Sequence, residues 1–266
     1  MNIKTNDFAM KILVSGAASG LGRYLLEKTG GMGLTRSSSL EEIKNVDQPY
    51  DMIMHCAFNM KRLESHETLN QYVEDSLCLT RTLTSVPHRF FVLMSTIDVY
   101  PLTGKVHYES EDINPNALSG LYPIFKLACE SIVRNKCESF LILRPGMLLG
   151  PYMRSNNLTR LILGHSGKIT LSKDSSYHCV LYEDILSVLK HARASALTGV
   201  YNLVRSDKVS LSAVAQHFAP ETQFGDYTYA PDPISNEKIS SIIPTFRSSS
   251  MDAIKQFISQ NSTKKT

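Results

Sequence analysis

The sequence predicts an α/β protein built on a doubly wound parallel sheet, with a small C-terminal subdomain. Three observations predict this class. A short apolar segment at residues 10–15 runs directly into a glycine-rich turn. Further apolar segments then alternate with stretches of helical periodicity, which is the order typical of a parallel sheet with crossover helices. The length of 266 residues suits one large domain of this kind.

The elements of the first half follow from apolar runs and from the residues that interrupt them. Ser39 with Glu42 predicts a capping box at the start of a short helix, and Pro87 ends a long one. Short apolar runs bounded by turn residues are expected to be buried strands. We expect strands at 10–15, 32–35, 51–57, 89–95 and 139–144, and helices at 21–28, 39–45, 67–86 and 121–134.

The character of the chain changes after residue 150, where Ser, Asn, Gly and Pro become frequent and the strands shorten. Helices are predicted at 184–194, 210–218 and 252–259, with Asp184 and Ser210 as N-caps. We expect a dinucleotide-binding core at 10–150. Residues 151–266 are expected to be mainly substrate-binding, with late core elements, so that the two parts form one intertwined unit.

Composition and charge exclude several classes of function. The net charge of +3, from 28 basic and 25 acidic residues, is too balanced to indicate nucleic acid. The five cysteines form no C-x-x-C pair, so neither a disulfide framework nor a metal site is expected. No apolar run approaches the roughly 20 residues of a membrane span, and residues 1–9 lack a signal-peptide core. We expect a cytoplasmic protein in which residues 1–9 extend outside the fold.

The glycine turn at residues 15–22 (Ser-Gly-Ala-Ala-Ser-Gly-Leu-Gly) lies between a predicted strand and a predicted helix. In this context Gly16 permits the tight turn, Gly20 lets the backbone approach a pyrophosphate, and Gly22 lets helix and strand pack closely. The helix N-terminus would supply free N–H groups to the phosphates. The alternative is a plain glycine-rich turn. The context favours a Rossmann-type dinucleotide site.

Several further segments occur in a characteristic order. They are His-Cys-Ala at 55–57, Ser-Thr-Ile-Asp-Val-Tyr at 95–100, Tyr-x-x-x-Lys at 122–126, Arg-Pro-x-x-x-x-Gly-Pro at 144–151, Val-Leu-Tyr-Glu-Asp at 180–184 and Tyr-Asn-Leu at 201–203. Over roughly residues 10–215 the set resembles the extended branch of the short-chain dehydrogenase/reductase superfamily, the NAD-dependent epimerase/dehydratase family of nucleotide-sugar enzymes. The glycine spacing departs from the G-x-x-G-x-x-G that is usual in that branch, because Ser19 stands where it has a glycine.

This resemblance implies a catalytic set of Thr96, Tyr122 and Lys126. Tyr122 would exchange a proton with the substrate oxygen, Thr96 would share that oxygen, and Lys126 would lower the pKa of the phenol and hold the ribose. Tyr24 and Lys28 have the same spacing but lie beside the glycine turn, so we interpret them as accidental. The expected cofactor-binding residues are Gly16, Ser19, Gly20, Leu21, Gly22, Arg36, Cys56, Ala57, Tyr122, Lys126 and Pro145.

Arg36 bears on which dinucleotide is bound. NAD-binding proteins usually place an acidic residue at the end of the second strand, and none is present at residues 34–38. Arg36 could instead pair with a 2′-phosphate, so NADP(H) is favoured over NAD(H). The alternative interpretation is that Arg36 is only a solvated surface residue.

Other positions depart from the family pattern. Met147 replaces an Asn that often contacts substrate, Tyr177 replaces an Arg that binds the nucleotide diphosphate, and Asp75 replaces an Asn near the cofactor. Arg154, Arg160 and Lys168 could supply a diphosphate clamp, or they are surface charges. Glu130 matches a family glutamate, but we interpret it as part of a solvated helix face.

The favoured function is an NADP(H)-dependent reductase acting on a carbonyl, with the 4-keto group of a nucleotide sugar as the expected substrate. The alternatives are an NAD-dependent nucleotide-sugar epimerase and a non-catalytic cofactor-binding protein. A dehydratase is disfavoured because Ile97-Asp98 follows Thr96 in place of an Asp-Glu pair. The resemblance also implies a homodimer, and we expect neither nucleic acid nor a membrane as partner.

Overall fold

The computed structural model describes residues 10–59, 66–163, 168–262 and no others. Its centre is a six-stranded, fully parallel sheet with the order β2-β1-β3-β4-β5-β9. This confirms the predicted fold class. The strands are β1 (Ile12–Ser15), β2 (Met32–Leu34), β3 (Met52–His55), β4 (Phe91–Met94), β5 (Phe140–Pro145) and β9 (Gly199–Leu203).

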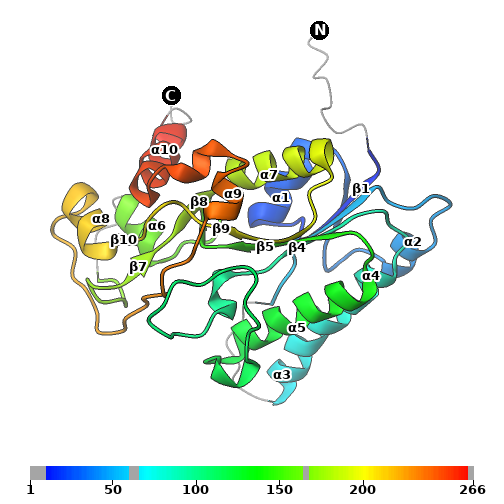
Figure 1. Cartoon of the computed structure of the whole chain (residues 1–266), viewed down its shortest axis with the longest axis horizontal. Helices are drawn as coiled ribbons and strands as arrows, with labels where there is room; N and C mark the ends of the chain where they lie inside the picture. The colour runs from blue at the N-terminus through cyan, green and yellow to red at the C-terminus, as the bar shows by residue number, and fades with distance from the viewer. Residues whose placement is uncertain (1–9, 60–65, 164–167, 263–266) are drawn as a thin grey trace, which may run out of the picture.

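Helices cover both faces of the sheet (Figure 1). On one face lie α1 (Gly20–Thr29) and α7 (Tyr182–Ser195); on the other lie α3 (His66–Val73), α4 (Leu79–Ser85) and α5 (Leu121–Lys136). Successive strand residues alternate between the two layers, as the pleat requires. Ile12 and Val14 pack toward α1 and α7, whereas Leu13 packs toward α4 and α5.

A smaller lobe is built from the later part of the chain and has its own apolar core. It lies at the end of the molecule opposite α2 (Leu40–Lys44) (Figure 1). Two small sheets belong to it, one parallel and one antiparallel. Its elements are β6 (Met147–Leu149), α6 (Asn157–Ile162), β7 (Ser176–Tyr177), β8 (Cys179–Leu181), β10 (Val209–Ser210), α8 (Leu211–Phe218) and α10 (Ser250–Ser262). Helix α9 (Glu237–Ser240) instead packs on β9 of the central sheet, and its Ile239 belongs to the core of that sheet.

The predicted helix at 67–86 is one continuous helical run with a π-helical turn, Glu74–Cys78, between α3 and α4. Such turns insert an extra residue and often mark functional sites. The first strand begins at Ile12 and not at Met10. The expected extension at residues 1–9 lies outside the described residues. Among the described residues, no helix is both long enough and apolar enough to cross a membrane.

Two of the predicted helix caps are wrong in detail. Ser39 occupies the N-cap position of α2, but its side chain makes no capping hydrogen bond. Asp184 is the third residue of α7, and its carboxylate accepts the backbone N–H of Leu181 at 2.9 Å from inside the helix. Ser210 is confirmed as a cap, because its hydroxyl accepts the N–H of Ala213.

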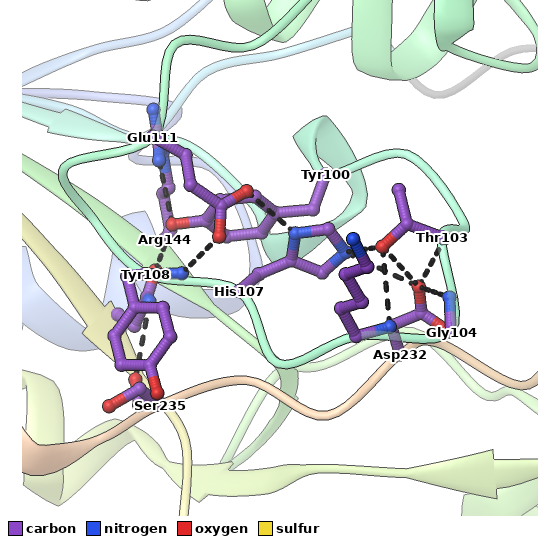
Figure 2. Close-up of polar contacts among 11 residues, drawn as sticks. Tyr100, Thr103, Gly104, His107, Tyr108, Glu111, Arg144, Asp232 and Ser235 are labelled. Carbon is purple, nitrogen blue, oxygen red and sulfur yellow. Dashed lines mark hydrogen bonds and ion pairs between the residues drawn. The ribbon is translucent and has the colours of Figure 1, made fainter.

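The long loop between β4 and α5 is attached to the small lobe through His107 (Figure 2). This buried imidazole is 2.8 Å from a Glu111 carboxylate oxygen and 3.3 Å from an Asp232 oxygen, and it stacks on Tyr100. The backbones of the two segments also hydrogen-bond, from His107 N–H to Pro233 O at 2.9 Å. This loop and this lobe form part of the wall around the candidate site.

Candidate active site

The turn between β1 and α1 depends on two glycines. Gly16 has φ = 74°, a left-handed conformation that favours glycine, and a Cβ there would lie 2.9 Å from the backbone nitrogen of Ala57. A Cβ on Gly22 would collide with the carbonyl of Gly16. The turn therefore lies close against α1 and the end of β3, which is the geometry that the sequence motif predicts.

The end of β3 is fixed to this turn by hydrogen bonds. The Ser15 hydroxyl is 2.7 Å from His55 Nδ1 and accepts the backbone N–H groups of Cys56 and Ala57, each at 3.2 Å. His55 is fully buried, with Nε2 2.8 Å from Thr80 Oγ1. Burial lowers the pKa of His55 to about 3, so the imidazole is neutral and serves as a structural link.

A cavity of about 550 Å³ opens beside this turn. Its wall combines the turn, the end of β2 and the π-helical turn. Four of the expected cofactor-binding residues line it: Gly16, Ser19, Arg36 and Ala57. Asp75 lines it as well. The volume and the mixed polar lining suit a nucleoside and its phosphates.

Arg36 does line this cavity, but it is not free. Its guanidinium is 2.9 Å from Asp75 Oδ2, and the Arg36 side chain is 73% exposed. Asp75 also accepts hydrogen bonds from the side-chain amides of Asn59 and Gln71. The end of the second strand carries no acidic residue, and the carboxylate beside Arg36 comes instead from the helical run 39 residues later.

The N-terminus of α1 departs from the expectation of free amide groups. The Gly20 N–H donates to the carbonyl of Tyr152 at 3.0 Å. One of the amides expected to bind phosphate is therefore occupied by an oxygen atom of the chain itself. The segment that brings Tyr152 here follows β6 in the small lobe.

The three expected catalytic residues lie together at the carboxyl end of β4. Thr96 caps the single 3₁₀ turn Ile97–Val99, and Tyr122 and Lys126 lie one turn apart on α5. Thr96 and Tyr122 both line the same cavity, and the Thr96 hydroxyl is near enough to the Tyr122 phenol to lower its pKa. The Lys126 ammonium is 6.0 Å from the centroid of the Tyr122 ring. The chain thus brings the three side chains into one cluster.

The electrostatics of this cluster differ from the expectation for Lys126. Burial raises the pKa of the Tyr122 phenol, the nearby Asp98 carboxyl raises it further, and the neighbouring Thr96 hydroxyl lowers it. Lys126 instead donates to the Met94 carbonyl at 2.7 Å, and burial lowers its own pKa to about 8. The Tyr122 phenol is therefore protonated at neutral pH.

Asp98 is a site residue whose contacts sequence reasoning did not identify. Its carboxylate accepts the Thr96 hydroxyl at 3.1 Å and the Tyr229 hydroxyl at 2.7 Å. Burial raises the pKa of Asp98, and the two hydroxyl groups lower it. Tyr229 comes from the small lobe, 131 residues away in sequence, so no local pattern could have indicated this contact.

A second cavity of about 540 Å³ adjoins this cluster. Thr96, Asp98 and Tyr122 line one side, and the small lobe provides the other. Arg154 lines both cavities and lies where they meet. The further residues around the second cavity include Pro145, Met147, Tyr177, Tyr227 and Tyr229.

Glu130 corrects the interpretation of a solvated helix face. It is 1% exposed and forms two hydrogen bonds with the Arg144 guanidinium, at 2.9 and 2.7 Å. The Ser95 hydroxyl donates to it at 2.5 Å. Arg144 also donates to the Tyr100 hydroxyl at 2.8 Å. This buried pair connects α5 to β5 directly behind Thr96.

The remaining predicted residues are distributed unevenly. Arg160 and Lys168 line neither cavity among the described residues, and Tyr24 packs against Tyr182 beneath α7. Several expected cofactor-binding residues support the walls of the cavities without lining them: Gly20, Leu21, Gly22, Cys56 and Lys126.

Comparison with known proteins identifies the family of this chain. The profile of the "NAD dependent epimerase/dehydratase family" matches residues 31–186. No curated protein matches the sequence. The match begins after the glycine turn, so the turn is identified by its geometry and not by the profile.

Three solved structures are similar in fold. MoeE5 in complex with UDP-glucose and NAD has a TM-score of 0.74 and 18% identity, over 96% of this chain and 100% of that one. UDP-glucuronic acid 4-epimerase from Bacillus cereus has a TM-score of 0.72 and 18% identity, over 94% and 99%. The dTDP-4-dehydrorhamnose reductase of Bacillus anthracis str. Ames, in complex with NADP, has a TM-score of 0.77 and 16% identity, also over 94% and 99%.

Proposed function

The chain belongs to the NAD dependent epimerase/dehydratase family, and from that premise we propose that it is an NAD(P)H-dependent reductase of a carbonyl. The proposed substrate is a nucleotide sugar with a 4-keto group. The two adjoining cavities would hold the dinucleotide and the substrate respectively. When bound, the dinucleotide supplies the hydride.

The residues at the meeting point of the cavities have distinct roles in this proposal. The Tyr122 phenol gives its proton to the carbonyl oxygen as that oxygen becomes a hydroxyl. Thr96, which lines the same cavity as Tyr122, positions the same oxygen. Lys126, anchored on the Met94 carbonyl, fixes the turn of α5 that carries Tyr122. A positioned acid of this kind contributes about 10²- to 10⁴-fold to a rate.

The observation that carries the choice of a reductase is the setting of Tyr122, whose phenol shares a cavity with the Asp98 carboxyl while the Lys126 ammonium is bound to the Met94 carbonyl. Burial and the Asp98 carboxyl both raise the pKa of this phenol. A protonated phenol is ready to donate, as reduction requires. An epimerase that begins by oxidising its substrate needs a group that accepts a proton first. The resting electrostatics of the cluster therefore favour reduction.

NADP(H) is proposed as the preferred dinucleotide because Arg36 lines the first cavity. A 2′-phosphate would compete with Asp75 for the guanidinium, and an exposed ion pair is weak enough to be exchanged. Asp75 could equally accept the ribose hydroxyls of NAD. The relatives are divided, since MoeE5 was solved with NAD and the Bacillus anthracis reductase with NADP.

The nucleotide-sugar substrate is supported by the second cavity and by the relatives. The cavity is lined by tyrosine rings, by Asp98 and, among the described residues, by one cation, Arg154. Aromatic rings and hydroxyl groups suit a sugar and a base. UDP-glucose and UDP-glucuronic acid are bound in the solved relatives. A homodimer is proposed on family resemblance alone.

The test is turnover with defined substrates. The chain would be incubated with NADPH or NADH and dTDP-4-dehydrorhamnose, and the loss of nicotinamide absorbance would be followed. In parallel, UDP-glucuronic acid with NAD⁺ would be examined for inversion by NMR. We expect NADPH oxidation that depends on the keto sugar. Inversion of UDP-glucuronic acid without net cofactor oxidation would establish the epimerase instead.

A further inference from the structure

The segment 150–154 (Gly-Pro-Tyr-Met-Arg) extends from β6 to the N-terminus of α1. The Tyr152 carbonyl accepts the Gly20 N–H at 3.0 Å. Tyr152 has φ = 63°, a conformation that costs a non-glycine residue roughly 1 kcal/mol or more. Two contacts with α1 compensate for this. The Tyr152 hydroxyl donates to Glu27 at 3.0 Å, and the Arg23 guanidinium lies 3.9 Å from the ring centroid.

Arg154 follows two residues later and differs from the other cation of the first cavity. Arg36 is paired with Asp75, whereas Arg154 has no ion pair or hydrogen bond with any side chain in the described part of the chain. It is exposed, and it lines the first cavity together with Ser19. A guanidinium in this state is available to an anion.

We propose that the segment 150–154 is a diphosphate-binding element of the dinucleotide site, with Arg154 as its binding residue and Tyr152 as its latch. In the conformation described, the Tyr152 carbonyl holds the Gly20 amide. A bound diphosphate takes that amide and the Arg154 guanidinium, and the latch moves away. This inference rests on the proposed function, because it assumes that a dinucleotide enters the first cavity.

The diphosphate of the dinucleotide is favoured over that of a nucleotide sugar by the position of the latch. Tyr152 contacts α1, and the N-cap residue of that helix, Ser19, lines the first cavity and not the second. Because Arg154 also lines the second cavity, movement of the segment would reshape the substrate site. The dinucleotide would then bind before the substrate.

The test uses three probes that differ in phosphate content: NADPH, ADP and adenosine, with dissociation constants measured by calorimetry at fixed ionic strength. For Arg154→Ala we expect NADPH and ADP to bind about tenfold more weakly, and adenosine to be unaffected, because one charge-assisted contact is lost. Arg154→Lys should recover part of the loss. Arg89→Ala, which removes an exposed cation near Asp51, is the matched control and should change nothing.

The latch is tested with Tyr152→Asn. Asn tolerates the left-handed conformation, but it lacks the ring and hydroxyl that hold the segment on α1. We expect ADP to bind several-fold more tightly and adenosine to be unaffected. Weaker ADP binding, or an equal change for adenosine, would overturn the latch.

The remaining arms separate the possible failures. UDP would be titrated in the presence of saturating NADP⁺, and if Arg154→Ala weakens UDP but not ADP, Arg154 serves the substrate and the inference is wrong. If NADPH binds every variant equally, the inference fails while the dinucleotide site stands. If neither the natural chain nor Tyr152→Asn binds NADPH, ADP or adenosine, the proposed function fails and the inference fails with it.

Discussion

Two carboxyl groups flank the segment Ser95–Thr96, the buried Glu130 and the half-buried Asp98, and their hydrogen-bond partners differ. On the core side, Glu130 accepts a hydrogen bond from the Ser95 hydroxyl and two from the Arg144 guanidinium. On the cavity side, Asp98 accepts the Thr96 hydroxyl and that of Tyr229. In the part of the chain that the structure describes, no cation lies within ion-pair distance of Asp98.

The difference indicates what each carboxyl does. A buried ion pair with all its hydrogen bonds made is costly to break, so Glu130 and Arg144 hold α5 against β5 and keep Tyr122 in place. Asp98 is held only by hydroxyl groups, which do not fully offset the cost of removing its charged form from water. The pKa of Asp98 is therefore raised. Such groups are found where chemistry needs them. We therefore assign Glu130 to the fold and Asp98 to the site.

The largest expected effect comes from breaking the core-side pair. Glu130→Gln leaves the Arg144 charge buried without its carboxylate, which should lower the free energy of unfolding by about 3–5 kcal/mol. Urea denaturation measures this. The double variant Glu130→Leu, Arg144→Leu should lose less free energy of unfolding than the sum of the losses in the single variants Glu130→Leu and Arg144→Leu. Additive losses would mean that the two side chains do not act as a pair.

The next effect concerns the proton that the site is expected to donate. Tyr122→Phe removes the acid while keeping the ring, so turnover of the keto sugar should fall at least about 100-fold. The dissociation constant of NADPH should change less than about twofold. Tyr24→Phe is the matched control, because that residue has the same spacing to a lysine but lies away from Thr96. Equal loss in both variants would point to damage to the fold.

A smaller effect with a definite sign is expected for Asp98→Asn. Since the pKa of Asp98 is raised in the folded chain, its ionisation destabilises the fold as the pH rises above the ordinary Asp value of about 3.9. The variant cannot ionise. It should therefore match the natural chain in stability at pH 3 and be more stable than the natural chain at pH 7. Thermal unfolding across this range measures the difference, and a variant less stable at pH 7 than at pH 3, relative to the natural chain, would contradict the assignment.

The smallest expected effect concerns an exposed pair, which extends the comparison to a third carboxylate. The pair of Arg36 and Asp75 is largely solvated, so Arg36→Ala should change stability by less than about 0.5 kcal/mol. If Arg36 binds the 2′-phosphate, NADPH affinity should fall about fivefold while NADH affinity stays constant. Fluorescence titration distinguishes the two. A parallel fall for both cofactors would remove the preference for NADP(H).

The sheet and the glycine turn were predictable because their determinants are local. The apolar strands, the breakers and the positive φ at Gly16 all follow from residues adjacent in sequence. The cluster of Thr96, Tyr122 and Lys126 was predictable from motif order. The capping box at Ser39 is wrong, because the Ser39 side chain makes no capping hydrogen bond. In the same turn, Ser37 and Ser38 hydrogen-bond to Thr35, as short hydroxyl side chains often do with nearby groups.

The contacts that the sequence did not indicate all join distant segments. Glu130 looks like a surface helix residue until Arg144 from the next strand reaches it. Asp98 gains its partner from Tyr229 in the other lobe. Tyr152 adopts a left-handed backbone conformation that Gly and Asn adopt more readily, so its residue type did not predict this conformation. Each depends on tertiary packing, which periodicity and motif spacing do not encode.

The central claim is that Tyr122 lies at the nicotinamide end of a dinucleotide held by the β1–α1 turn. A crystal structure of the chain with NADPH tests it most directly. We predict the adenosine in the cavity lined by Ser19 and Arg36, and the nicotinamide carbon that gives up hydride facing the Thr96–Tyr122 pair. A dinucleotide bound in the opposite direction, or a nicotinamide ring turned away from Tyr122, would contradict the account.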